Sequence, residues 1–167
     1  MFPESIRQPA GRVIHALINS GLTIATAESC TGGLIIGALT EIPGSSQAVY
    51  GGFITYANAA KSGMIGVPEA MIAQYGAVSS HVARAMAEGA RKTAMVDIAI
   101  AVTGIAGPGG GSAEKPVGLV HLACSTTAGV SHIERRFGDL GRQEIRAATV
   151  KAALELTLAC ILPQNGD

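Results

Sequence analysis

The sequence contains no tryptophan, and aromatic residues make up only 4% of its 167 residues. It also lacks an excess of either charge, because its 12 lysines and arginines balance its 12 aspartates and glutamates. A chain without net positive charge has no long-range field that would attract nucleic acid or an anionic membrane. We therefore expect no nucleic-acid and no membrane partner, and an anionic substrate would have to be held by local contacts.

Cysteine and histidine are scarce, with three and four residues. An odd number of cysteines without paired spacing argues against a disulfide framework and fits a reducing compartment. No C-x-x-C motif or histidine cluster indicates zinc. No apolar run approaches the roughly 20 residues that cross a bilayer, and the first residues lack the apolar core of a signal peptide. We expect a cytoplasmic protein without a metal site.

Small and branched apolar residues dominate instead, and hydrophobic residues reach 48% of the chain. This is enough for a complete core at this length, so we expect one domain over residues 1–167. The same alanine-rich, weakly charged composition is consistent with an apolar surface that a partner subunit covers. We therefore expect a homo-oligomer, a dimer or larger.

Helical and strand periodicities alternate along the first two thirds of the chain, and a hairpin pattern follows. We expect Asn58 to cap a short helix that contains Lys61, and another short helix to follow Pro68. The pattern predicts longer helices over residues 11–20, 34–39, 79–93 and 142–162 and strands over residues 22–27, 49–56, 97–102, 117–126 and 130–137.

This order predicts an α/β fold with three layers, in which helices cover both faces of a mixed, mainly parallel central sheet that ends in a hairpin. The pair Gly51-Gly52 interrupts one strand and indicates a bulge or a close backbone approach. Ligands of such sheets collect at the carboxyl ends of the strands. The turns after Ala27 and Val102 leave two such ends, and we expect them to share one cleft.

Ser29 lies between a strand and a helix, in the stretch Glu28-Ser29-Cys30-Thr31-Gly32-Gly33. Such a turn offers a projecting hydroxyl, and its glycines let backbone N–H groups approach a ligand closely. A simpler interpretation is that Ser29 or Thr31 caps the helix. Cys30 is a rival nucleophile, although its setting better fits a small buried thiol.

A nucleophilic serine needs a base, and the four histidines fall on helix or strand positions away from the glycine turns. Lysine can serve when burial lowers its pKa. Lys61 follows a strand end, and no aspartate or glutamate occurs between Glu41 and Glu69. The alternative is a solvated lysine on a short helix.

Other groups near strand ends could contact a substrate. Tyr56 ends a strand, although this position is also usual for an amphipathic side chain without a catalytic role. The glycine-rich loop of residues 103–112 could offer backbone donors to a phosphate or an oxyanion, but it matches no phosphate-binding motif. Arg142 carries the guanidinium fork that suits phosphate, or it is one more surface arginine.

Taken in order, several segments resemble the CinA C-terminal domain family, the nicotinamide-nucleotide amidases. The resemblance covers about residues 13–158. It rests on Thr26-Ala27-Glu28-Ser29-Cys30-Thr31-Gly32-Gly33, Gly52-Phe53-Ile54-Thr55-Tyr56 with Asn58 and Lys61, Tyr75-Gly76-Ala77-Val78-Ser79, Thr103-Gly104-Ile105-Ala106-Gly107-Pro108 and Glu114-Lys115-Pro116-Val117-Gly118.

The resemblance implies hydrolysis of the carboxamide of nicotinamide mononucleotide to nicotinate mononucleotide and ammonia, without metal or organic cofactor. It implies a catalytic pair of Ser29 and Lys61, with Tyr56 assisting. The residues implied to bind the substrate are Cys30, Thr31, Gly32, Gly33, Asn58, Thr103, Gly104 and Arg142, and backbone N–H groups of residues 31–33 are expected to stabilise the oxyanion.

Two features depart from the family pattern. The stretch Gly138-Asp139-Leu140-Gly141-Arg142 is longer than the expected Gly-Asp-Arg, which affects where Arg142 lies, and Thr103 stands where serine is also expected. Two other functions remain open on the sequence. One is a nucleotide-binding or assembly module that does not cleave its ligand, and the other is a hydrolase of another small amide or ester.

Overall fold

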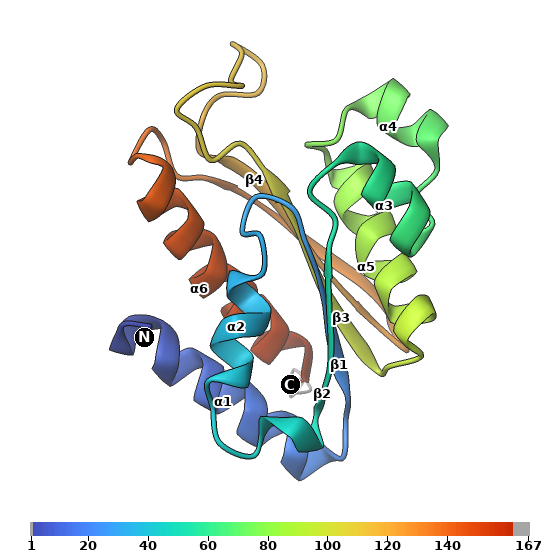
Figure 1. Cartoon of the computed structure of the whole chain (residues 1–167), viewed down its shortest axis with the longest axis vertical. Helices are drawn as coiled ribbons and strands as arrows, with labels where there is room; N and C mark the ends of the chain where they lie inside the picture. The colour runs from blue at the N-terminus through green and yellow to red at the C-terminus, as the bar shows by residue number, and fades with distance from the viewer. Residues whose placement is uncertain (1, 162–167) are drawn as a thin grey trace, which may run out of the picture.

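The computed structural model describes residues 2–161 and shows a five-stranded sheet between two layers of helices (Figure 1). The strands are β1 (Ile24–Glu28), β2 (Val49–Ile54), β3 (Ile98–Gly104), β4 (Leu119–Thr126) and β5 (Gly129–Arg136). Their order in the sheet is β2-β1-β3-β4-β5. β1 pairs in parallel with β2 and β3, whereas the β3–β4 and β4–β5 pairs are antiparallel. This confirms the predicted α/β fold with a mixed sheet that ends in a hairpin.

Helices lie on both faces of the sheet. They are α1 (Glu4–Ser20), α2 (Leu34–Thr40), α3 (Asn58–Ile65), α4 (Glu69–Tyr75), α5 (Ser80–Ala94) and α6 (Arg142–Ile161), and a short 3-10 helix covers Ser45–Gln47. Figure 1 shows α1, α2 and α6 on one face and α3, α4 and α5 on the other, where α4 packs on α3 and α5. The β1–α2 turn, drawn in blue, lies between α6 and α3 at one end of the sheet.

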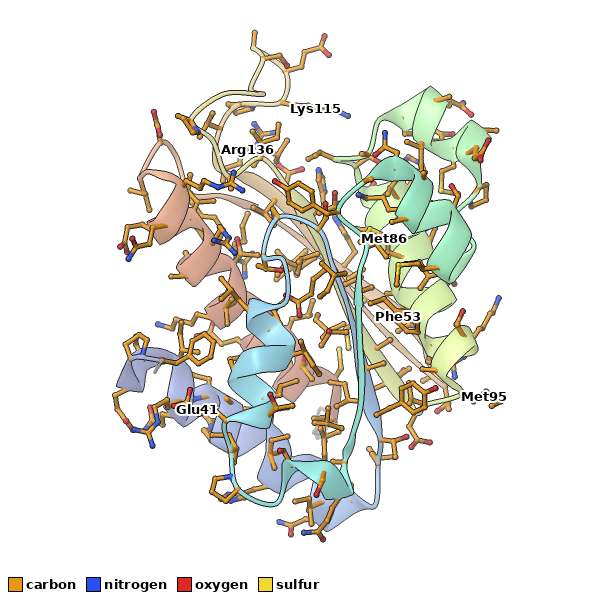
Figure 2. The ribbon with its side chains drawn as sticks, in the orientation of Figure 1. Glu41, Phe53, Met86, Met95, Lys115 and Arg136 are labelled. Carbon is orange, nitrogen blue, oxygen red and sulfur yellow. The ribbon has the colours of Figure 1, made fainter. Side chains whose placement is uncertain are left out.

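The two faces of the sheet carry side chains of different size. On the α1 and α6 face, Ile100 and Leu122 are buried with Leu17 in the larger core. On the α5 face, the strands contribute mainly alanines, such as Ala99 and Ala101, which allow α5 to pack close to the sheet. Figure 2 labels Met86 and Phe53 in this second layer, between α5 and β2. Small and aliphatic side chains therefore fill the core on both faces of the sheet, which agrees with the low aromatic content.

The predicted glycine features of β2 are present. The β1–β2 register shifts by one residue between Val49 and Gly51, which is a bulge. At Gly52 an added Cβ would lie 2.6 Å from Thr26 Oγ1, so this position is also a close approach. The bulge and the glycine allow β2 to run tightly beside β1 up to the end where Ser29 follows.

Some predicted boundaries were wrong. The first helix begins at Glu4 and not at Gly11, because its buried face continues upstream through Ala10 and Ile6 despite Pro9. β3 extends two residues beyond Val102, because residues 103 and 104 keep their pairing with β4. The predicted end of the last helix at Leu162, and Pro163 beyond it, lie outside the described residues.

The predicted cap of α3 was also wrong. Asn58 is its first helical residue and is exposed, and the N-cap position is Ala57, which makes no side-chain cap bond. Within residues 2–161, no helix is both long and apolar enough to span a membrane.

Candidate functional site

Ser29 is fixed at the carboxyl end of β1 by its own backbone. Its N–H donates to the carbonyl of Val102 in the neighbouring β3, two residues before that strand ends (3.1 Å), and its carbonyl accepts from the N–H of Gly32 (3.1 Å). The carboxyl ends of β1 and β3 therefore lie side by side, as the expected shared cleft requires. The turn closes at Gly33, whose φ of 99° is a conformation that side chains with a Cβ avoid. Ser29 keeps 9% of its surface exposed.

Glu28, directly before Ser29, caps helix α2. Its buried carboxylate accepts hydrogen bonds from the backbone N–H groups of Gly33 (3.0 Å), Ile35 (3.0 Å) and Ile36 (2.8 Å), and from Thr26 Oγ1 (3.1 Å). A carboxylate at this position satisfies the free N–H groups of the helix start and complements the helix dipole.

The cap formed by Glu28 rules out the simpler interpretation that Ser29 or Thr31 caps α2. Neither the Ser29 nor the Thr31 hydroxyl bonds to an N–H group of α2, and the Thr31 hydroxyl is buried without a hydrogen-bond partner. Because Glu28 caps the helix, the side chain of Ser29 is free for another role.

Lys61 reaches Ser29 from the other side of the turn. Its Nζ lies 3.2 Å from Ser29 Oγ, and it donates to the carbonyl oxygens of Thr55 (2.8 Å) and Tyr56 (3.3 Å). The side chain is 1% exposed. The N–H of Thr55 in turn donates to the carbonyl of Glu28 (2.8 Å), so the chain after β2 holds the base beside the serine turn.

The surroundings of Lys61 favour the neutral amine. Burial lowers the pKa of Lys61, because the ammonium loses its hydration. Among the described residues, no ion pair includes Lys61. A solvated lysine on a surface helix, the alternative interpretation of the sequence, is therefore excluded.

Cys30 does not have the features of a nucleophile. It is 5% exposed, and burial raises the pKa of its thiol to about 12. A reactive cysteine needs a lowered pKa, since the thiolate is the nucleophile. Cys30 is the small buried thiol that its sequence setting favoured.

The structure shows that only some of the backbone N–H groups expected to stabilise the oxyanion are available. The N–H of Gly32 donates to the carbonyl of Ser29, and the N–H of Gly33 donates to Glu28. These two groups are already engaged, in contrast to the expectation for residues 31–33. In residues 2–161, the N–H groups of Cys30 and Thr31 donate to no backbone carbonyl and to no side chain of another residue.

Tyr56 and Arg142 lie together at the same end of the sheet. Arg142 Nη2 donates to the phenol oxygen of Tyr56 (3.1 Å), and Nη1 donates to the carbonyl of Gly107 (2.9 Å). The longer stretch before Arg142 therefore does not carry it away from the site. Tyr56 is 60% exposed, and its carbonyl is one of the two that hold Lys61.

Thr103 and Gly104 belong to β3 and have local structural partners. The buried hydroxyl of Thr103 donates to the carbonyl of Ala77 (2.8 Å). An added Cβ at Gly104 would lie 2.7 Å from the side chain of Val120, so glycine permits the close pairing with β4. Lys115 of the following loop donates to the carbonyl of Tyr75 at the end of α4 (2.7 Å), and Figure 2 shows its side chain extending toward that helix.

Histidines do not take part in this group. His121 and His132 face each other on β4 and β5, with ring nitrogens 3.0 Å apart. None of the hydrogen bonds in the described part of the chain joins a histidine to Ser29 or Lys61. Residues 2–161 also contain no group of three or more His, Cys, Asp or Glu side chains placed to hold a metal ion.

Sequence reasoning missed two residues of this region, Glu28 and Arg146. Arg146 of α6 donates through Nε to the carbonyl of Cys30 (3.1 Å) and through Nη2 to the carbonyl of Thr31 (2.9 Å). An acidic residue just before a glycine-rich helix start was a usable signal for Glu28. Arg146 lies more than 110 residues from its partners, and no local pattern marks it.

The chain that carries this site has many relatives among known proteins. The family described as "CinA C-terminal domain" matches residues 6–161. A "CinA-like protein" from Synechococcus sp. (strain RCC307) is 52% identical over 148 residues, which cover 88% of this chain and 36% of that protein. A "CinA-like protein" from Geobacter sulfurreducens is 55% identical over 135 residues, covering 81% and 32%. The chain thus spans about a third of the length of these relatives.

Solved structures show the same fold over almost the whole chain. The competence/damage inducible protein CihA from Agrobacterium tumefaciens has a TM-score of 0.93 and 56% identity, and the match covers 95% of this chain and 97% of that one. A competence-damaged protein (CinA) superfamily protein from Klebsiella pneumoniae has a TM-score of 0.89 and 31% identity, with 93% and 97% covered. The chain therefore belongs to the CinA C-terminal domain family.

Proposed function

We propose that this chain is an amidase that hydrolyses the carboxamide of nicotinamide mononucleotide, with Ser29 as nucleophile and Lys61 as base. The observation that carries the proposal is the set of three oxygens around Lys61 Nζ: Ser29 Oγ at 3.2 Å and the carbonyls of Thr55 and Tyr56 at 2.8 and 3.3 Å.

This set of partners orients the lone pair of a neutral lysine. A neutral amine has two N–H bonds and one lone pair, and carbonyl oxygens can only accept hydrogen bonds. The carbonyls of Thr55 and Tyr56 therefore take the two N–H groups, and the lone pair faces the hydroxyl of Ser29. Burial that lowers the pKa of Lys61 makes this neutral form accessible.

The reaction then proceeds in two halves. Lys61 takes the proton of Ser29 as the serine oxygen attacks the carboxamide carbon, and the C=O bond opens to an oxyanion. The oxyanion collapses, the C–N bond breaks, and Lys61 returns the proton so that ammonia leaves. Water then attacks the nicotinoyl nucleotide ester with Lys61 as base, which releases nicotinate mononucleotide and restores Ser29. Tyr56 assists in two ways: its carbonyl holds Lys61, and its phenol is an alternative donor of the proton that the leaving ammonia takes. No cofactor takes part.

The substrate assignment rests on family resemblance and on the position of Arg142. Arg142 adjoins Tyr56 and offers a guanidinium group to a phosphate at the end of the sheet where Ser29 lies. Asn58 and Gly104 complete the proposed binding surface, whereas Thr103 is 1% exposed and its hydroxyl is held by the carbonyl of Ala77. A carboxamide seated on Ser29 would place the charged end of a mononucleotide toward this arginine.

The test is ammonia release from nicotinamide mononucleotide, nicotinamide and a panel of other small amides and esters by the purified chain. Ser29→Ala and Lys61→Met should each abolish or strongly reduce release, whereas Lys151→Met should not, because Lys151 is exposed on α6. The Lys61 variant should lose turnover more than substrate affinity, because a base acts mainly in the transition state.

Three outcomes would contradict the proposal. Calorimetric binding of the nucleotide without ammonia release would indicate a binding module. Faster turnover of another amide or ester would change the substrate, and undiminished release by Ser29→Ala would remove the nucleophile.

We further propose that the chain acts in the cytoplasm as a homo-oligomer. Its cysteines at positions 30, 124 and 160 form no disulfide bond, and large apolar side chains are exposed on the edge strand β2, including Tyr50 (65%) and Ile54 (40%). Light scattering of the purified chain measures the oligomeric state, and a monomer at micromolar concentration would contradict this.

A further inference from the structure

We infer that Arg146 is a positioning residue of the reaction: by holding two carbonyls of the serine turn, it fixes the N–H groups of Cys30 and Thr31 as oxyanion donors. The inference rests on the proposed amidase function and assigns a role to a residue on α6 that does not touch the substrate.

The guanidinium group of Arg146 donates hydrogen bonds to two successive peptide units of the serine turn. Nε donates to the carbonyl of Cys30 (3.1 Å), and Nη2 donates to the carbonyl of Thr31 (2.9 Å). Two parallel N–H groups on a planar guanidinium fix direction as well as distance, which a lysine ammonium does not do. Arg146 is half-buried on a long helix packed against α1 and β4, so the fork has a rigid base.

The direction of each carbonyl determines the direction of an N–H group. In the described chain the only cis peptide bond is Gly107–Pro108, so the bonds of the serine turn are trans. In a trans peptide the C=O and the following N–H point in opposite directions. Arg146 holds the carbonyl of Cys30 and thereby turns the N–H of Thr31 away from α6. Helix α3, which carries Lys61, flanks the turn on the other side (Figure 1).

The N–H of Cys30 is oriented in the same way from within the turn. The carbonyl of Ser29 accepts from the N–H of Gly32 (3.1 Å), so the Ser29–Cys30 peptide is also pinned by its oxygen. The N–H of Gly32 belongs to the Thr31–Gly32 peptide, and Arg146 Nη2 donates to the carbonyl of that same peptide. Arg146 therefore also fixes the group that holds the Ser29 carbonyl. Three carbonyls in a row are therefore held, and the N–H groups of residues 30 and 31 are left as the donors.

These two groups fit the task for two further reasons. The residue after a nucleophile commonly contributes its N–H to an oxyanion hole. The turn is also tightly packed, with Ser29 at 9%, Cys30 at 5% and Thr31 at 0% exposure, and donors that are fixed in advance stabilise a developing charge best. The start of α2 supplies no alternative, because Glu28 takes its N–H groups.

The experiment compares Arg146→Ala and Arg146→Lys with wild type in ammonia release from nicotinamide mononucleotide, and it adds the affinity for the product nicotinate mononucleotide by calorimetry. Arg146→Ala should lower kcat by about 10²-fold, the order of the loss of one oxyanion donor. KM and product affinity should change by less than about threefold, because the donors act in the transition state. Arg146→Lys should recover only part of kcat.

Chemical rescue provides the readout that a purely structural role would not move. A hollow of about 830 Å³ between α1, α2 and α6 is lined by Arg146, so a small cation has access to its position. Millimolar guanidinium should raise kcat of Arg146→Ala in a saturable way and leave Arg146→Lys unchanged. The matched control is Arg135→Ala, because Arg135 is exposed and, within residues 2–161, its side chain donates only to the carbonyl of Glu134. Its kcat should equal that of wild type.

The outcomes separate this inference from the proposed function. If wild type shows no ammonia release that depends on Ser29, both are overturned. If wild type is active and Arg146→Ala keeps its kcat, or raises KM alone, only the role of Arg146 is overturned. If the alanine variant does not fold, the same comparison of kcat and KM is made for Arg146→Lys, provided that its melting temperature equals that of wild type.

Discussion

Replacing Gly89 by alanine should displace the helix that carries Lys61. Gly89 lies inside α5, where an added Cβ would meet the carbonyl oxygen of Ile65, the last residue of α3, at 1.9 Å. Real Cβ contacts are essentially never shorter than 3.0 Å, so the two helices must separate by about 1.1 Å. Because the obstacle is backbone, no side-chain rotation relieves it.

The magnitude follows from two effects of opposite sign. Overpacking costs about 1–3 kcal/mol, and alanine in a helix regains about 0.5–1 kcal/mol relative to glycine. The net result is a loss of about 0–2.5 kcal/mol of unfolding free energy. Lys61 lies one helical turn before Ile65, and its Nζ is 3.2 Å from Ser29 Oγ. A displacement of about 1 Å near catalytic groups can lower turnover by about 10²-fold.

The assay pairs urea denaturation with ammonia release, and Gly63→Ala is the matched control. Gly63 is also a helical glycine, in α3 itself, but it is exposed and an added Cβ there has nothing within 4 Å. This variant should gain about 0.5–1 kcal/mol and keep its activity. A Gly89→Ala variant as stable and active as Gly63→Ala would refute the close contact of α3 with α5.

Three further predictions concern buried or hydrogen-bonded charges. The value of kcat/KM should rise with pH through the lowered pKa of Lys61 and level off above it, because only the neutral amine is a base. The free energy of unfolding, relative to that of Lys61→Met, should also rise between that pKa and the ordinary value of about 10.4. In this pH window the unfolded chain binds more protons than the folded chain. Asp97→Asn should cost about 1 kcal/mol at neutral pH in thermal denaturation, because Asp97 accepts from the N–H and hydroxyl of Thr23 (both 2.8 Å). These bonds lower the pKa of Asp97, so its contribution is complete above about pH 4 and is lost as pH falls through the folded-state value. A stability difference that does not shrink as pH falls below about 4 would contradict the assignment. Glu28→Gln should cost about 2–4 kcal/mol and lower kcat, because an amide has one acceptor oxygen where the carboxylate binds three N–H groups of α2; an unchanged melting temperature would argue against this cap.

The local features of the site follow from the sequence. The strand, glycine turn and helix around Ser29 were predicted because β-branched residues, glycines and an apolar helix face each leave a clear pattern over a few residues. The convergence of two strand ends was predicted because parallel strands share an edge. The pair Ser29 and Lys61 was named from the family resemblance, and the structure places the two side chains 3.2 Å apart.

What the sequence could not reveal depends on contacts between distant segments. The carbonyls of Thr55 and Tyr56 that hold Lys61 are backbone groups, which every residue has, so no residue type marks them. Arg146 resembles any other charged residue of a helix until α6 packs beside the serine turn. The free N–H groups could be identified only after the partners of Gly32 and Gly33 were known.

The central claim is that Ser29 attacks the substrate carboxamide, and trapping the acyl-enzyme tests it most directly. The enzyme is mixed with nicotinamide mononucleotide, quenched in acid during turnover and digested, and the peptides are examined by mass spectrometry. We expect a nicotinoyl nucleotide ester on Ser29. The same group on Cys30 or on any other residue would contradict it.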